Sequence, residues 1–205
     1  MKGITVTGQG QAVGPRDQCS ITVGADVRAA NAPDALARSA EALDRMRSTL
    51  LEGGIPASSL ATSAVSLSPV YETYPTVAGF SASVDLTAKT TDLAKVGQLL
   101  TAVVVAGGDA ARLNQVSYTH SDSSALTAAA REAAWADALA RATQLAELSG
   151  RSLGEVTGIV EAGVPTPGPR GPMRMAAMAA EAAPVPVDAG ESAVAVALTV
   201  RWSLR

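Results

Sequence analysis

Aromatic residues, histidine and cysteine are scarce in this chain of 205 residues. Only 3% of the residues are aromatic, so the core must be built mainly from alanine and branched aliphatic side chains. The single cysteine, Cys19, excludes an internal disulfide and a CxxC metal site. It shares one face of an alternating segment with Ile21 and Val23, which predicts a buried structural thiol rather than a reactive one.

Concentrated positive charge and long apolar runs are also missing. The net charge is −3 and the basic residues are scattered, which argues against a nucleic-acid-binding protein. The longest apolar run, Leu99 to Ala106, is shorter than the ~18–20 residues that a transmembrane helix needs. No signal-peptide pattern precedes the first alternating segment. As it stands, the sequence predicts a cytoplasmic protein, or a periplasmic or secreted one if a signal peptide was removed.

Alternating and helical patterns divide the chain into ten elements in the order β-β-α-β-β-α-β-α-β-β. Strands are predicted at about 3–13, 18–28, 62–74, 78–90, 112–120, 153–161 and 192–204, and helices at about 31–51, 92–106 and 125–148. Because hairpins dominate, the order predicts an α+β fold of mostly antiparallel sheet with helices packed on one face. We expect a single domain over residues 1–205, in which two loose units, each with strands and a covering helix, are an option.

The longest predicted helix, 125–148, contains no proline or glycine and carries an apolar stripe that we expect to pack on the sheet. The stripe consists of Leu126, Ala130, Ala133, Ala134, Leu139, Ala142, Leu145, Ala146 and Leu148. In the first strand, Gly8 and Gly10 indicate bulges or close packing. Their Gly-x-Gly spacing does not predict a dinucleotide site, because a strand and not a helix amino terminus follows them.

Most of the prolines lie in residues 163–190, which we predict to be a flexible surface excursion. This segment carries Met173, Met175 and Met178. Thioethers are soft ligands that suit Cu(I), so a copper site is one interpretation. Methionine also adapts to imperfect apolar surfaces, and an interface with a neighbouring subunit or a disordered flap is the interpretation that we favour.

Half of the aromatic side chains lie around one predicted hairpin turn, at Tyr71, Tyr74 and Phe80. Such a cluster forms either a small local core that fixes the turn or a recognition surface. The only histidine, His120, is followed by a serine and an aspartate, but a catalytic triad must meet in space and not along the sequence. We therefore predict no catalytic, cofactor-binding or metal-binding residue.

Several segments together resemble one known family. They are ITVTGQGQAVGPRD, GIPASSLATSAVSLSPVYE, GFSASVDLTAKTTDLAKVGQLLTAVVVAGGD, AAREAAWADALARATQLAELSGRSLGEV and PVPVDAGESAVAVALTVRWSL. Their order and spacing resemble the SIMPL-domain (DUF541) family, whose members include bacterial periplasmic and outer-membrane-associated immunogenic proteins. The resemblance implies an α+β fold and, for some members, large ring- or channel-like homo-oligomers. It implies no catalytic residues.

Two hypotheses about function follow. The first is a non-enzymatic protein that acts through homo-oligomeric assembly or binding of another protein, in a stress- or envelope-related role. The alternative is a small-molecule or metal-binding module that uses the Met-rich segment or the aromatic hairpin. A hydrolase that depends on His120 comes third.

Overall fold

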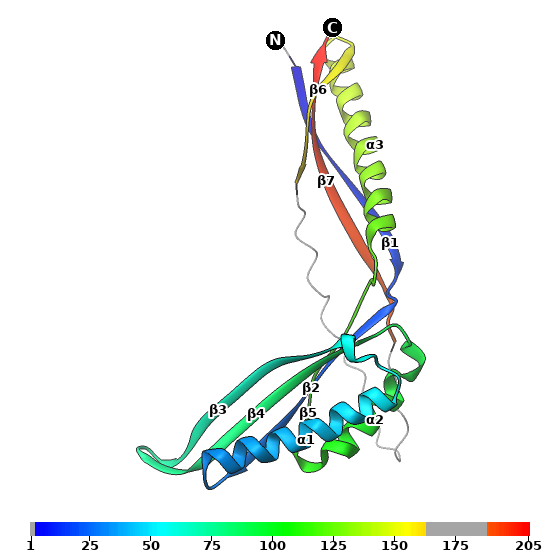
Figure 1. Cartoon of the computed structure of the whole chain (residues 1–205). Coiled ribbons are helices and arrows are strands. Elements are labelled where there is room, and N and C mark those ends of the chain that lie inside the picture. The colour runs from blue at the N-terminus through cyan, green and yellow to red at the C-terminus, as the bar shows by residue number, and fades with distance from the viewer. Residues whose placement is uncertain (1–2, 163–187) are drawn as a thin grey trace, which may run out of the picture. The chain divides into compact units, whose positions relative to one another are not determined.

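The computed structural model describes residues 3–162 and 188–205, which form two compact units. Unit 1 contains residues 3–15, 122–162 and 190–205, and unit 2 contains residues 16–121 and 188–189. The elements follow in the predicted order (Figure 1), and the α+β arrangement of antiparallel sheets and helices is confirmed. Except for residues 188–190, the excursion predicted at 163–190 lies outside the described residues.

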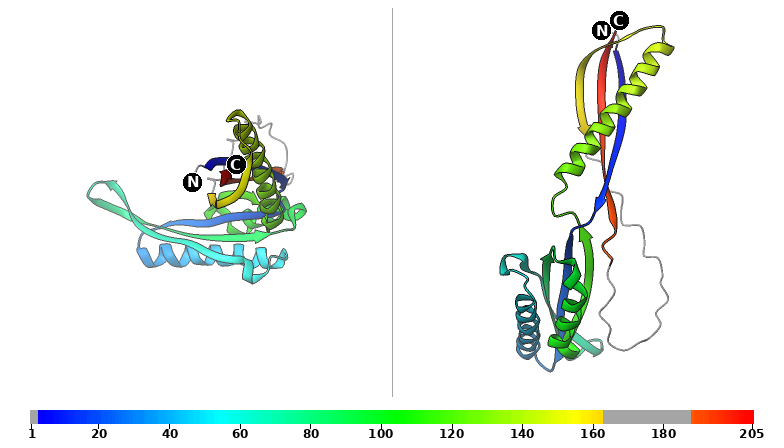
Figure 2. Two further views of the ribbon diagram at one scale, coloured as in Figure 1. Left: turned by 90° about the horizontal axis from the view of Figure 1, so that it is seen from above. Right: turned by 90° about the vertical axis from the view of Figure 1, so that its right-hand side faces the viewer.

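Unit 2 is a four-stranded antiparallel sheet with two helices on one face. The strands lie in the order β3 (Leu60–Thr73), β4 (Thr76–Thr90), β2 (Gln18–Ala29) and β5 (Ala111–Thr119). The two long helices are α1 (Ala32–Glu52) and α2 (Val96–Gly107). Figure 2 shows α1 running along one face of this sheet.

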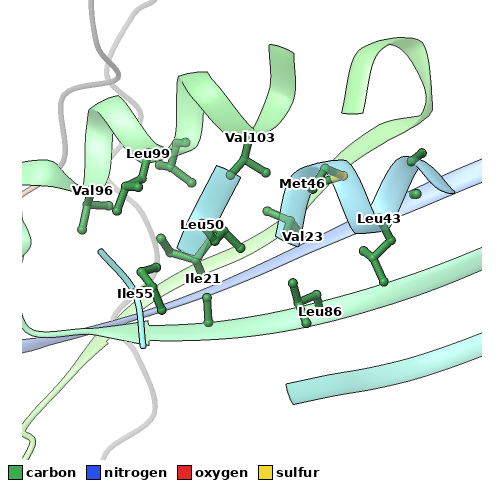
Figure 3. Packing of buried hydrophobic residues seen from close by; sticks show 14 of the residues in the cluster. Ile21, Val23, Leu43, Met46, Leu50, Ile55, Leu86, Val96, Leu99 and Val103 are labelled. Carbon is green, nitrogen blue, oxygen red and sulfur yellow. The ribbon is translucent and has the colours of Figure 1, made fainter. Parts of the chain in front are cut away.

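The core of unit 2 lies between this sheet and its helices. Ile21 and Val23 of β2 are buried together with Met46 of α1 and Val103 of α2, as Figure 3 shows. Cys19 belongs to the same cluster and is fully buried, which confirms the predicted structural thiol. In the described part of the chain, one helical stretch, Leu93–Ala110, is long and apolar enough to cross a membrane. A third of that stretch is buried, and it contributes side chains to this core.

The helices begin and end at the signals that the sequence carries. The side-chain oxygen of Asn31 accepts a hydrogen bond from the Asp34 backbone N–H at 2.9 Å, which caps α1. Gly54, Gly108 and Gly150 follow α1, α2 and α3 with φ of 93°, 59° and 70°. Glycine adopts this left-handed conformation without a steric penalty, so these residues end the helices.

Unit 1 is a three-stranded antiparallel sheet with one helix across it. The strands lie in the order β1 (Gly3–Pro15), β7 (Glu191–Leu204) and β6 (Leu153–Ala162). The helix is α3 (Ser124–Leu148), and it packs mainly on β1 and β7 (Figure 2). Pairing of β1 with β7 runs without a register shift from Gly3↔Ser203 to Pro15↔Glu191. The bulges predicted at Gly8 and Gly10 are therefore wrong, and close packing is the reason for both glycines.

The backbone of α3 rests almost directly on β1. A Cβ atom at Gly8 would lie 2.5 Å from the backbone nitrogen of Ala138, and one at Gly10 would overlap the backbone of Ala130 and Ala134. No side chain fits between the two backbones at these positions. The methyl groups of successive alanines therefore fill the remaining space between helix and strand.

This close contact corrects the predicted apolar stripe of α3. The buried residues of α3 are alanines spaced four apart, namely Ala130, Ala134, Ala138, Ala142 and Ala146. By contrast, Leu139 is 39%, Leu145 46% and Leu148 77% exposed. The leucines lie outside the contact because the glycines of β1 bring the helix too close for a larger side chain.

Side chains of α3 also close the free edge of β1. The Asp137 carboxylate accepts a hydrogen bond from the Gln9 backbone N–H at 2.9 Å, and Arg141 donates to the Thr7 carbonyl at 3.3 Å. Arg141 and Asp137 form an ion pair at 3.0 Å. The backbone groups that an additional strand would bind are thus already occupied at the middle of this edge.

Candidate interaction surface

The β3–β4 hairpin extends past its neighbouring strand in unit 2. Pairing of β2 with β4 ends at Ala29↔Phe80. Pairing of β3 with β4 continues through Val70↔Gly79 and Tyr71↔Val77 to Thr73↔Thr76. Figure 1 shows the turn projecting past the adjacent end of α1. We call residues 71–77 the hairpin tip; β2 does not support them.

Two tyrosines form the apolar part of the hairpin tip. Tyr71 is 46% and Tyr74 82% exposed, and their ring centroids are 5.5 Å apart with the planes tilted by 53°. Val77 is also exposed. The rings contact each other but are not covered, so they do not form the buried local core that one interpretation of the sequence predicts. Exposed, paired aromatic side chains are typical of a recognition surface.

Phe80 lies apart from the tip, at the base of the hairpin. It is half-buried and lines a hollow of about 220 Å³. We call this the basal hollow, and it is lined by Arg28, Ala29, Val70, Ala78, Gly79 and Phe80. The structure therefore brings Tyr71 and Tyr74 together and places the third predicted aromatic residue in a different feature of the same hairpin.

The hairpin tip and the basal hollow each carry one charged side chain. Glu72 belongs to the tip, and Arg28 lines the hollow. Both residues are exposed. Among the residues that the structure describes, neither side chain takes part in a hydrogen bond or an ion pair. An arginine beside an apolar wall is a site that fits a carboxylate attached to an apolar group.

The free edge of β3 is better suited to side-chain contacts than to pairing with an added strand. β3 is an edge strand that is largely exposed, and Val65 and Leu67 are 62% and 47% exposed. Pro69 lies within this edge strand, and it has no N–H to donate. A partner would therefore contact β3 through side chains more readily than through a continuous ladder of backbone hydrogen bonds.

The remaining predicted candidates do not converge on a catalytic site in the described residues. Met173, Met175 and Met178 lie outside those residues. Next to His120, the hydroxyl and backbone N–H of Ser121 both donate to the Asp17 carboxylate at 2.6 Å. These bonds lower the pKa of Asp17. Ser121 thus ties the segment that follows β5 to Asp17, which directly precedes β2.

The buried thiol and its aromatic neighbour are held in their neutral forms. Burial raises the pKa of the Cys19 thiol, so a reactive thiolate does not form at neutral pH. Burial, with a further contribution from the neighbouring Cys19, raises the pKa of Tyr118 to about 12. Cys19 and Tyr118 are opposite each other on β2 and β5, and both serve the core of unit 2.

Sequence patterns alone did not identify Arg28, Glu72, Val65 and Leu67 as parts of this surface. The two apolar residues lie in an alternating segment that equally predicts a covered strand. The two charged residues gain significance only from the strand register, which shows that β2 ends at the base of the hairpin. The nearest available signal was the absence of charge in β3 between Leu60 and Val70, which is unusual for an exposed edge.

Comparison with known proteins places the chain in a family. Residues 4–202 match the SIMPL family, described as a protein of unknown function (DUF541). The chain is 31% identical over 217 aligned positions to the 26 kDa periplasmic immunogenic proteins of Brucella melitensis and Brucella abortus. In both comparisons the alignment covers 98% of this chain and 84% of the relative. The family match spans nearly the whole chain, and we conclude that this protein is a member of the SIMPL (DUF541) family.

Proposed function

We propose that this SIMPL-family protein is not an enzyme and acts by assembling into a homo-oligomer through its β3–β4 hairpin. The observation that carries the proposal is the exposed Tyr71–Tyr74 pair at a tip that extends past β2. Tyrosine combines a large apolar surface with a polar group and loses little conformational freedom on binding. It is accordingly enriched among residues that dominate protein interfaces.

We expect a second copy of the chain to bind through side-chain packing and not by adding a strand to a sheet edge. Pro69 interrupts the donors of the β3 edge, and Asp137 with Arg141 occupies the β1 edge. At these two edges a partner is bound more readily through side chains, and the hairpin tip offers exposed side chains for such a contact. Truncating one such interface tyrosine typically costs about 2 kcal/mol or more, which corresponds to roughly a 30-fold change in dissociation constant.

We further propose that the protein works in the periplasm. Both Brucella relatives are named as periplasmic proteins, and they align with almost the whole of this chain. The single cysteine of the chain is buried, so the fold contains no disulfide and an oxidising compartment has no internal disulfide to form or break. Fractionation of the source cells tests the location: recovery of the protein with cytoplasmic markers contradicts it.

Native mass in solution tests the assembly. Light scattering after size-exclusion chromatography should give a mass above that of one chain at micromolar concentration. The double variant Tyr71→Ser, Tyr74→Ser should shift the population toward a single chain. Val105→Thr is the matched control, because Val105 is 74% exposed in α2 of the same unit but lies outside the hairpin. A wild-type mass of one chain at every concentration refutes the proposal, as does a tyrosine variant that assembles like the control.

A further inference from the structure

We infer that the basal hollow receives the hairpin tip of a second copy of this chain, with Arg28 paired to Glu72 of that copy. The inference rests on the proposed assembly and names the surface that the tip contacts. It assigns a role to two features that the assembly alone does not explain. These are an open hollow beside an exposed arginine, and a lone acidic residue on an apolar tip.

The basal hollow has the composition of a receptor for an aromatic side chain. Its walls are formed by Val70, Ala78 and Phe80. Gly79 has no room for a side chain, because a Cβ atom there would lie 2.7 Å from the Ala29 carbonyl oxygen. The hollow is therefore bounded at this position by the backbone of Gly79 and Ala29. Tyr74, the most exposed aromatic residue in the described chain, is the complementary group on the tip.

The charges of the two surfaces are complementary. Arg28 is the only charged residue that lines the hollow, and Glu72 is the only charged residue of the tip. Within the described parts of one chain, each of these side chains lacks an ionic partner. Glu72 lies two positions from Tyr74, so a tip that places Tyr74 against Phe80 brings an acidic group to the same region as Arg28. Opposite charges at such a contact fix its register and disfavour other partners.

The position of both surfaces on one hairpin allows the contact to be reciprocal. The Val70↔Gly79 pair lies four residues from Tyr74, about 13 Å along an extended strand. Two hairpins laid antiparallel can therefore each place a tip in the hollow of the other. Such a two-fold contact uses the same residues on both copies and contains two Arg28–Glu72 pairs.

Charge reversal tests the pairing. The self-association constant is measured by sedimentation equilibrium for Arg28→Glu, for Glu72→Arg and for the double variant. Each single change should weaken association about ten-fold or more, because it places like charges together. The double change should restore it to within a few-fold of the unmodified chain. Arg47→Glu on α1 is the matched control, since Arg47 is also an exposed arginine of unit 2, and circular dichroism checks that each variant folds.

The outcomes separate this inference from the proposed assembly. If both single variants associate like the Arg47→Glu control while the tyrosine double variant still dissociates, assembly through the tip stands and the basal hollow is not its receptor. If the double charge variant is weaker than either single variant, Arg28 and Glu72 do not pair. Octanoate is a carboxylate attached to an apolar chain and serves as the small-molecule probe. If Arg28→Glu leaves assembly unchanged but abolishes octanoate binding, the hollow is a small-carboxylate site and the inference is overturned. Loss in both single variants with recovery in the double variant supports it.

Discussion

Substitution of Gly10 by alanine is the most direct test of the contact between α3 and β1. A Cβ atom at this position would overlap the backbone of Ala130 and Ala134, which belong to a regular helix and cannot move aside as a flexible side chain can. The added methyl group must push α3 away from β1 and loosen the alanine contact along unit 1. Overpacking of a close-packed core costs typically 1–3 kcal/mol. Because the clash is with backbone, we expect the upper end, about 3 kcal/mol.

Gly158→Ala provides the matched control, because a Cβ atom at Gly158 in β6 meets nothing within 4 Å. Replacing a strand glycine by alanine in open space is neutral or stabilises by roughly 0.5 kcal/mol, since it reduces the freedom of the unfolded chain. Both tryptophans, Trp135 and Trp202, lie in unit 1 with their ring centroids 6.0 Å apart. Tryptophan fluorescence during urea unfolding therefore reports on this unit. Equal unfolding free energies for Gly10→Ala and Gly158→Ala would refute the close contact.

Two further predictions concern the β1 edge and the core of unit 2. Asp137→Ala removes the acceptor of the Gln9 N–H and the ion-pair partner of Arg141, so it should open the β1 edge to pairing with other chains. Light scattering should then show concentration-dependent aggregation. Scattering like that of the unmodified chain would contradict this prediction. The pKa of Tyr118 is raised from 10.0 to about 12, so the folded state holds the phenolic proton more tightly than the unfolded state. Its contribution to stability is complete below about pH 10 and is lost as the pH rises toward about 12. Urea unfolding followed by circular dichroism should show this decline, and Tyr118→Phe should reduce it; an equal decline in both proteins would show that another group is responsible.

The order and type of the elements could be predicted because their signals are local. Asn31 caps α1 through a bond to a residue three positions away, and Gly150 ends α3 through its own backbone conformation. Strand alternation identified the buried face of β2, which includes Cys19. Each of these features depends on neighbours in the sequence, so no knowledge of the sheet was needed.

The buried face of α3 could not be predicted in the same way. A helical pattern ranks Leu145 above Ala138 as a core residue because leucine is the more hydrophobic side chain. In the structure, the distance between helix and strand decides the ranking, and Gly8 and Gly10 set that distance from more than a hundred residues away. The hydrophobic pattern of α3 alone does not contain this information.

The candidate surface could likewise be predicted only where its residues are close in the sequence. The cluster of Tyr71 and Tyr74 was visible because the two residues are close in the sequence. Arg28 could not be connected with them, because the end of β2 relative to the hairpin depends on the register of β2 with β4. Alternation shows which side chains share a face, but it does not show where one strand stops beside another.

The pairing of β1 with β7 has a consequence for the order of events during synthesis. β1 is made before unit 2 and its partner β7 after it, whereas the described strands of unit 2 all lie between residues 16 and 121. Unit 2 can therefore fold while the chain is still growing. Once it has folded, the Asp17–Ser121 bonds hold the end of β1 and the start of α3 together. The entropy of closing a loop of about a hundred residues is then already lost, and this loss no longer opposes the docking of α3 on β1. The inserted unit thereby acts as an internal template that converts a contact between distant parts of the sequence into an effectively local one.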